Sequence, residues 1–257
     1  MKEVLRLDHG VLTHFPASAG RNKPALILCP GGGYEYCSIR EGAPVARAFA
    51  RDGVEAFVLE EYDCTEVPLG VKPLHAVRVC RLGERTCGTA RHRGRPHCGR
   101  RIFGGAHLAG LLAATWHDAD WFPAGTDLQA HRPNAAVLCA IRWSRQASMP
   151  IAAALLQLAG ENAAEQRRFF TRNAGFCTDA AQFPMAQLTD ATVPVENAAA
   201  RGGFAPRTST TNCTCSPSAY TDSRSRGFET ADPMKGRVPD RHINRWQALC
   251  AEWLKEE

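Results

Sequence analysis

The sequence lacks any run of about 18 apolar residues, the minimum that a helix needs to cross a bilayer. Residues 1–10 mix charged with apolar side chains, so the apolar core of a secretory signal is missing as well. No internal repeat is visible, which argues against a solenoid or a propeller. We therefore expect a cytoplasmic protein that neither spans nor binds a membrane.

The chain also lacks the cysteine spacing of a disulfide framework or of a common zinc site. Its 11 cysteines are odd in number, and no Cys-x-x-Cys pair occurs. Cys29 and Cys139 stand in apolar runs and are expected to be small buried hydrophobes. His75, His117 and His131 are expected to be surface or core histidines rather than ligands. We predict no metal and no cofactor, although zinc-ligand residue types do occur at Cys80, Cys87, His92, His97, Cys98, Cys213 and Cys215.

The excess of positive over negative charge is confined to one segment of the chain. The formal net charge is +5, but residues 78–101 hold eight arginines and one acid, Glu84, so this segment alone carries +7. The rest of the chain therefore carries −2. A nucleic-acid-binding protein spreads its basic residues over a face or along a helix. We predict no nucleic-acid partner, and a metal- or nucleic-acid-binding module is the least favoured alternative.

The first part of the chain predicts a parallel unit of an α/β sheet. Residues 25–29 form a short apolar run that ends at proline and glycines, and residues 54–59 form a second such run. Between them, residues 38–52 show helical apolar spacing, with Gly53 as a stop signal. A strand, a helix and a strand within so few residues are typical of parallel strands joined by a crossover helix.

The remaining chain alternates between regular and irregular stretches. Residues 76–102 and 198–228 are rich in Arg, Gly, Ser and Thr and have few apolar residues to bury. We predict one α/β domain over residues 1–257, with a mostly parallel central sheet that is flanked by helices and disrupted in these two stretches. The regular stretches are a strand at 134–139, helices at 106–116 and 151–170, and an amphipathic terminal helix at 243–254.

A glycine run follows the first apolar strand. The run Cys-Pro-Gly-Gly-Gly-Tyr at residues 29–34 resembles the oxyanion loop of α/β-hydrolases. Such a loop needs glycine because its backbone N–H groups must point at a developing oxyanion without a steric clash.

Further segments, in order along about two thirds of the chain, resemble acetyl-xylan-esterase-like and dienelactone-hydrolase-like small carbohydrate esterases. The resemblance implies an α/β-hydrolase fold and hydrolysis of a short-acyl or acetyl ester by a Ser-Asp-His mechanism. It implies a small-molecule ester substrate such as an acylated sugar, and no cofactor. The matching segments begin at Pro44, Ala56, His107, Arg132, Asp190 and Arg245.

The resemblance also assigns roles to individual residues. Asp190, in the run Asp-Ala-Thr-Val-Pro-Val-Glu-Asn, matches the acid of the triad. Gly32 and Gly33, together with Gly104 after the nucleophile position, match the oxyanion-hole donors. The nucleophile position holds Phe103, which cannot attack an acyl carbon.

The histidine position holds Thr221, which cannot act as the general base. Both losses fall in or at the edge of the two irregular stretches. We hypothesise that these stretches are translated in a shifted reading frame, because back-translation of residues 100–105 and 220–226 in another frame permits Gly-Gly-Ser-Ser-Ala-Gly and His-Gly-Leu-Ser-Leu-Ala. The alternatives are a diverged, non-catalytic relative and a peptidase-like hydrolase.

Overall fold

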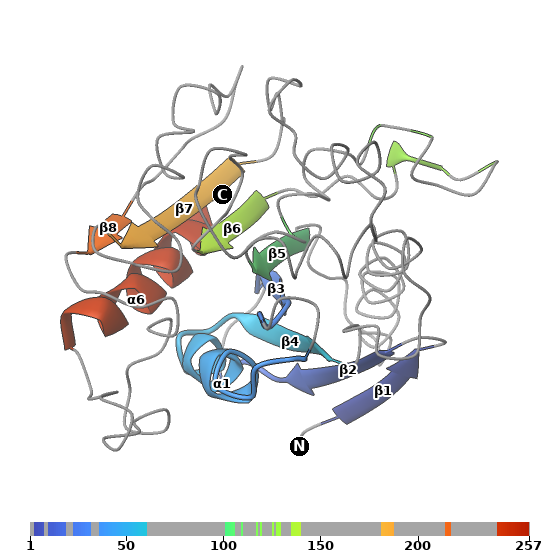
Figure 1. Cartoon of the computed structure of the whole chain (residues 1–257), viewed down its shortest axis with the longest axis horizontal. Helices are drawn as coiled ribbons and strands as arrows, with labels where there is room; N and C mark the ends of the chain where they lie inside the picture. Colours follow the sequence, from blue (N-terminus) through green and yellow to red (C-terminus); the bar gives the residue numbers. More distant parts are fainter. Residues whose placement is uncertain are drawn as a thin grey trace, which may run out of the picture.

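An eight-stranded mixed sheet is the framework of the computed structural model (Figure 1). The structure describes residues 3–7, 10–18, 23–31, 36–60, 101–105, 109, 117, 119, 125, 127–129, 135–139, 181–187, 214–216 and 241–256. The strands are β1 (Glu3–Leu7), β2 (Gly10–Phe15), β3 (Ala25–Leu28), β4 (Glu55–Glu60), β5 (Arg101–Gly105), β6 (Ala135–Cys139), β7 (Ala181–Gln187) and β8 (Thr214–Ser216).

The strand order is β1-β2-β4-β3-β5-β6-β7-β8. β1 pairs with β2 and β2 with β4 in antiparallel fashion, whereas every pairing from β4 through β8 is parallel. The predicted mostly parallel sheet is therefore confirmed, with an antiparallel hairpin added at one edge. The strands at 25–29, 54–59 and 134–139 are confirmed within one or two residues, as β3, β4 and β6.

The helix expected at residues 38–52 begins later than its apolar spacing predicts. Helix α1 spans Ala43–Arg51, with Gly42 at the N-cap and Pro44 in the first turn, where its missing N–H costs nothing. The N–H of Glu41 donates to the Ser38 carbonyl at 3.0 Å, so the residues before Gly42 form a turn instead. The expected stop is correct, because Gly53 adopts a φ of 87° directly after the helix.

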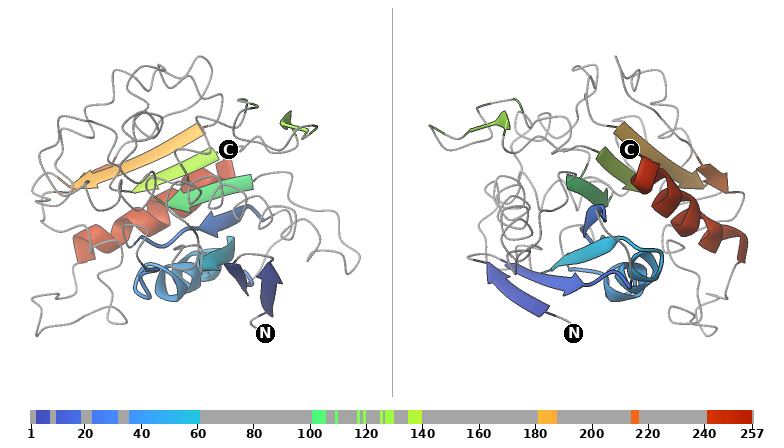
Figure 2. Two further views of the ribbon diagram at one scale, coloured as in Figure 1. Left: turned by 45° about the vertical axis from the view of Figure 1, so that its right-hand side comes forward. Right: turned by 180° about the vertical axis from the view of Figure 1, so that it is seen from behind.

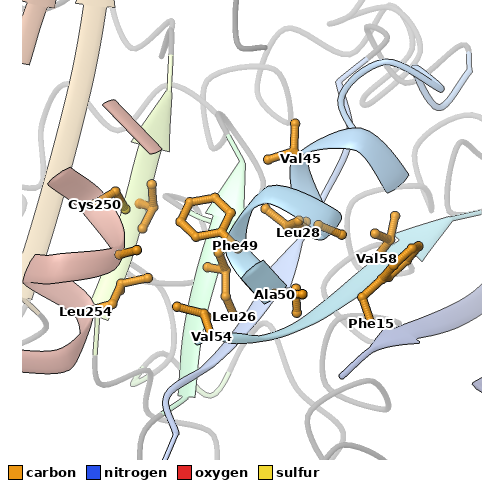
Figure 3. Packing of buried hydrophobic residues seen from close by; sticks show 14 of the residues in the cluster. Phe15, Leu26, Leu28, Val45, Phe49, Ala50, Val54, Val58, Cys250 and Leu254 are labelled. Carbon is orange, nitrogen blue, oxygen red and sulfur yellow. The ribbon is translucent and has the colours of Figure 1, made fainter. Parts of the chain in front are cut away.

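The main apolar core lies between the sheet and two helices on one of its faces (Figures 1 and 3). Helix α6 (Arg241–Glu256) is the predicted terminal helix. It meets α1 through Phe49 and Trp246, whose rings lie edge to face with centroids 5.7 Å apart. The buried side chains of the cluster include Leu26, Leu28, Val45, Phe49, Val54, Val58, Val137, Cys250 and Leu254.

Both faces of the central strands are buried. In β4, Ala56 and Val58 belong to the core beneath α1, while Phe57 and Leu59 alternate to the opposite face and are equally inaccessible to solvent. Burial on both faces is typical of parallel strands in α/β proteins and explains why these strands are continuous apolar runs in the sequence. The further views in Figure 2 show β3 and β5 side by side in the middle of the sheet.

Short parts of the two stretches predicted to be disrupted form strands, while the rest of both stretches lies outside the described residues. Arg101 and Ile102, at the end of the first stretch, begin β5. In the second stretch Thr214, Cys215 and Ser216 form β8, the outermost parallel strand. Backbone N–H and C=O groups form the pairing of a sheet, so a segment with few apolar side chains can still add to an edge. The helices expected at 106–116 and 151–170 lie outside the described residues, apart from Ala109, which is helical and buried.

Candidate functional site at the carboxyl ends of β3 and β5

The strand order reverses at β3. The chain runs from β3 through α1 to β4 on one side, and then returns to place β5 on the other side of β3. Connections that leave neighbouring parallel strands in opposite directions open a crevice at the carboxyl ends of those strands, and α/β proteins bind ligands there. The topology therefore places the candidate site at the carboxyl ends of β3 and β5.

The strand register brings two of the sequence-predicted segments to this crevice. Ile27 pairs with Phe103 and Leu28 with Gly104 in the parallel ladder between β3 and β5. Cys29, Pro30 and the start of the glycine run follow β3 directly. The residue at the predicted nucleophile position is thus on the strand adjacent to the one that leads into the glycine run.

Phe103 is the third of the five residues of β5, and Gly104 and Gly105 complete the strand. The family resemblance places a nucleophile on the sharp turn that follows such a strand. In this chain the strand instead continues two residues beyond Phe103 and pairs Gly105 with Leu138 of β6. The other predicted site residues, Gly32, Gly33, Asp190 and Thr221, lie outside the described residues.

The beginning of the glycine run is anchored to the turn that precedes α1. The N–H of Gly31 donates to Oε2 of Glu41 at 2.6 Å, and the carbonyl of Gly31 accepts from the N–H of Ser38 at 2.8 Å. Sequence reasoning did not single out Glu41. Its signal was present, because Ser-x-x-Glu before an apolar helical run is the pattern of a capping box.

The turn beside the glycine run carries two exposed apolar side chains. Tyr36 is 55% exposed and Ile39 is 81% exposed, whereas Ser38 between them is buried. A large apolar side chain that is exposed to this degree leaves surface free for contact with another molecule. Cys37, in the same turn, is half-buried and is not part of a disulfide.

A network of polar side chains around Glu55 lies at the amino end of β4, away from the carboxyl ends of β3 and β5. Glu55, the first residue of β4, accepts from His14 Nε2 at 2.8 Å and from the Ala17 N–H at 3.2 Å, and its other oxygen lies 3.4 Å from Lys23 Nζ. Burial raises the pKa of Glu55, but the hydrogen bonds and charges of these neighbours outweigh burial and hold its pKa below the ordinary value. Since Glu55 lies at the amino end of β4, this network belongs to the fold and not to the crevice.

Among the residues that the structure describes, no group of three or more His, Cys, Asp or Glu side chains is arranged to hold a metal ion. The cysteines and histidines of zinc-ligand type between residues 80 and 98, and at 213, are outside the described part, while Cys215 lies on β8. His117 is described and is exposed, as expected for a surface histidine. Of the described helices, none has both the length and the apolar character to cross a membrane.

Comparisons with known proteins identify the fold. No protein-family model and no curated sequence matches the chain. Solved structures do match over nearly its whole length. A sugar hydrolase from Lactococcus lactis is 20% identical, with a TM-score of 0.71, and the match covers 100% of this chain and 98% of that one.

Two other similar solved structures are those of hydrolases. The carboxylesterase Cest-2923 from Lactobacillus plantarum WCFS1 is 19% identical, with a TM-score of 0.71 and coverages of 100% and 96%. An acetyl ester-xyloside bifunctional hydrolase from Caldicellulosiruptor lactoaceticus is 19% identical, with a TM-score of 0.67 and coverages of 96% and 88%. At this level of identity the similarity concerns the fold. The chain has the α/β-hydrolase fold, as its sequence predicts.

Proposed function

We propose that the protein is a carboxylic ester hydrolase of the short-acyl type, with esters of acylated sugars as its substrates. The observation that carries this proposal is the parallel pairing of β3, which leads into Gly31, with β5, which contains Phe103. The solved neighbours include a carboxylesterase, a sugar hydrolase and an acetyl ester-xyloside hydrolase, and these names support the substrate class. The activity remains a proposal because function depends on the site and not on the fold.

In the proposed reaction a serine at the nucleophile position attacks the ester carbonyl while a histidine takes its proton. Asp190 holds the imidazole of that histidine and stabilises it when it becomes charged. The N–H groups of Gly32, Gly33 and Gly104 donate to the oxygen that becomes negative in the tetrahedral intermediate. Each such donor lowers the barrier by about 3 kcal/mol. The intermediate collapses as its bond to the alcohol breaks, and the departing alcohol takes the proton from the histidine. Water, deprotonated by the same histidine, then attacks the acyl-enzyme and releases the acid and the free serine, so the reaction needs no cofactor.

The chain as written carries Phe103 and Thr221 where this reaction needs serine and histidine. This observation favours a second candidate, a non-catalytic protein with the same fold. The position of Phe103 inside β5, two residues before the strand ends, is compatible with a sheet that no longer presents a nucleophile. The shifted-frame hypothesis separates the two candidates, because it attributes both losses to the coding sequence and not to divergence.

Sequencing the gene across codons 76–102 and 198–228 tests the two candidates first. If the frame is shifted, the restored chain is expected to hydrolyse p-nitrophenyl acetate and an acetylated xylo-oligosaccharide. Its Asp190→Asn variant should lose about 10⁴-fold in kcat, since the histidine would then adopt the wrong tautomer. The chain with Phe103 is expected to show no turnover above the buffer rate.

Two outcomes would contradict the proposal. An intact single frame that encodes this chain, together with no turnover, would leave the non-catalytic candidate. Turnover by the chain with Phe103 in place would show that the nucleophile lies elsewhere. A panel of p-nitrophenyl esters from acetate to octanoate tests the acyl preference, and a maximum at the long chains would overturn the short-acyl part.

A further inference from the structure

We propose that Glu41 is a positioning residue of the oxyanion loop, and that its carboxylate fixes the path of the backbone at Gly31, where the glycine run begins. This inference rests on the proposed function, because it assigns a role within the same site. Neither the glycine run itself nor the resemblance to esterases includes Glu41.

Both polar groups of the Gly31 backbone are hydrogen-bonded to the same turn. Oε2 of Glu41 accepts the Gly31 N–H at 2.6 Å, which is short and charge-assisted. The Ser38 N–H donates to the Gly31 carbonyl at 2.8 Å, and the Glu41 N–H donates to the Ser38 carbonyl at 3.0 Å. Glu41 therefore links the first glycine to a turn that is itself hydrogen-bonded, and Ser38 of the same turn holds the carbonyl of that glycine.

The turn at residues 38–42 is itself packed against the sheet. Ser38 is 5% exposed, and Gly42 is so tightly packed that an added Cβ would lie 3.2 Å from Val58 Cγ1 and 3.6 Å from Pro30 Cγ. Val58 belongs to β4 and is fully buried. The turn that carries Glu41 is therefore closely packed against the sheet, so that the carboxylate holds Gly31 from a fixed position.

A glycine run needs such an anchor more than other loops do. Glycine has no side chain to pack and gains the most backbone freedom when it is released. Oxyanion donors act only when they are held within a few tenths of an ångström of the developing charge, and a displacement of about 1 Å can cost about 100-fold in rate. The N–H of Gly31 is engaged by Glu41 and so is not itself a donor to the substrate, which agrees with the proposed function, where the donors are Gly32 and Gly33.

The first test measures the loop itself and does not depend on activity. Amide hydrogen exchange is followed by NMR on glycine-labelled protein for the parent chain, Glu41→Ala and Glu41→Gln. We expect exchange at Gly31 to rise about 10-fold or more in Glu41→Ala, because the acceptor is gone. The amide oxygen of Glu41→Gln can still accept, so this variant should recover most of the protection. Glu252→Ala, the same truncation on an exposed position of α6, is the matched control and should leave Gly31 unchanged.

The second test uses the chain with the restored reading frame, which is the one expected to have esterase activity. Glu41→Ala is expected to lower kcat about 10- to 100-fold with little change in KM, since the anchored donors act on the transition state and not on the bound ester. Glu41→Gln should restore kcat to within a few fold. A purely structural role would lower the thermal midpoint of both variants in proportion and would leave kcat of the folded fraction unchanged.

The outcomes of the two tests are independent. Unchanged exchange at Gly31 in a folded Glu41→Ala variant would overturn the inference whether or not the protein is an esterase. Faster exchange with kcat unchanged would overturn it as well, because the loop would then not be limiting. An inactive parent chain with faster exchange in Glu41→Ala would leave the anchor standing and would count against the proposed function alone.

Discussion

Truncation of Glu55 should destabilise the fold and leave the crevice intact. Oε2 of Glu55 accepts a hydrogen bond from His14 and another from the Ala17 backbone, and Oε1 lies 3.4 Å from Lys23 Nζ. The side chains of His14 and Lys23 are 19% exposed and that of Glu55 is 22% exposed, so solvent screens the interactions only in part. The network connects β2, the first residue of β4 and Lys23 just before β3. It therefore holds these three segments together at the amino ends of β3 and β4.

The expected loss of stability follows from the hydrogen bonds and the ion pair that Glu55→Ala would remove. A hydrogen bond to a charged group contributes about 1.5–3 kcal/mol, and a partly exposed ion pair contributes less than about 1 kcal/mol. We therefore expect Glu55→Ala to lower the free energy of unfolding by about 3 kcal/mol. Urea denaturation followed by tryptophan fluorescence measures this difference. Glu252→Ala, on an exposed helix position, should stay within about 0.5 kcal/mol of the parent.

The pH dependence supplies an independent check on the same carboxylate. Because the pKa of Glu55 is lower in the folded protein than the ordinary pKa of a glutamate, the folded state binds this proton less readily than the unfolded state. The stabilisation by Glu55 is therefore present above the unfolded value and is lost as the pH falls through the folded-state pKa. The advantage of the parent over Glu55→Gln should shrink as the pH falls from about 7 to about 3. An advantage that stays constant or grows over this range would refute the assignment.

Two further substitutions test the core and the turn that supports the glycine run. Phe49→Ala removes a fully buried ring and its edge-to-face contact with Trp246, and should cost about 3–5 kcal/mol in urea denaturation; a cost below about 1 kcal/mol would show that α1 and α6 do not meet as described. Gly42→Ala places a methyl group 3.2 Å from buried Val58, and overpacking should outweigh the entropic gain and cost about 1 kcal/mol, measured as a lower thermal midpoint. An unchanged or higher midpoint would mean that the turn can shift.

Sequence patterns were sufficient for the elements whose apolar side chains are close together along the chain. The runs that became β3 and β4, and the apolar spacing of the terminal helix, predict their elements within a few residues. The hairpin of β1 and β2 was missed because Glu3 and Arg6 interrupt the apolar pattern of the first strand, although only two residues separate Leu7 from its partner Gly10.

Elements that depend on tertiary pairing were harder to predict. Pro184 lies in β7 and lacks the N–H that a strand donates, so the sequence there argues against a strand. The structure pairs Pro184 with Leu138 of β6, and β7 pairs with β8 only from Met185 onward. The adjacency of β3 and β5 was equally beyond sequence patterns, because strand order is set by how the crossovers pack and not by local spacing.

The two sides of the candidate site differ in how well the written chain supports them, and this difference favours a shifted frame over divergence. The side at the end of β3 is locally consistent: Gly31, the turn at Ser38 and the carboxylate of Glu41 fit one another at hydrogen-bond distances. Each glycine lowers stability by about 0.5–1 kcal/mol relative to alanine wherever its freedom is not needed, so a fold without acyl chemistry would gain by losing the run. The nucleophile and histidine positions instead fall in or beside stretches whose composition is unsuited to a buried core. A shift of the reading frame within each stretch would explain both losses and leave the glycine run untouched, whereas divergence would have to replace serine and histidine separately while retaining that run.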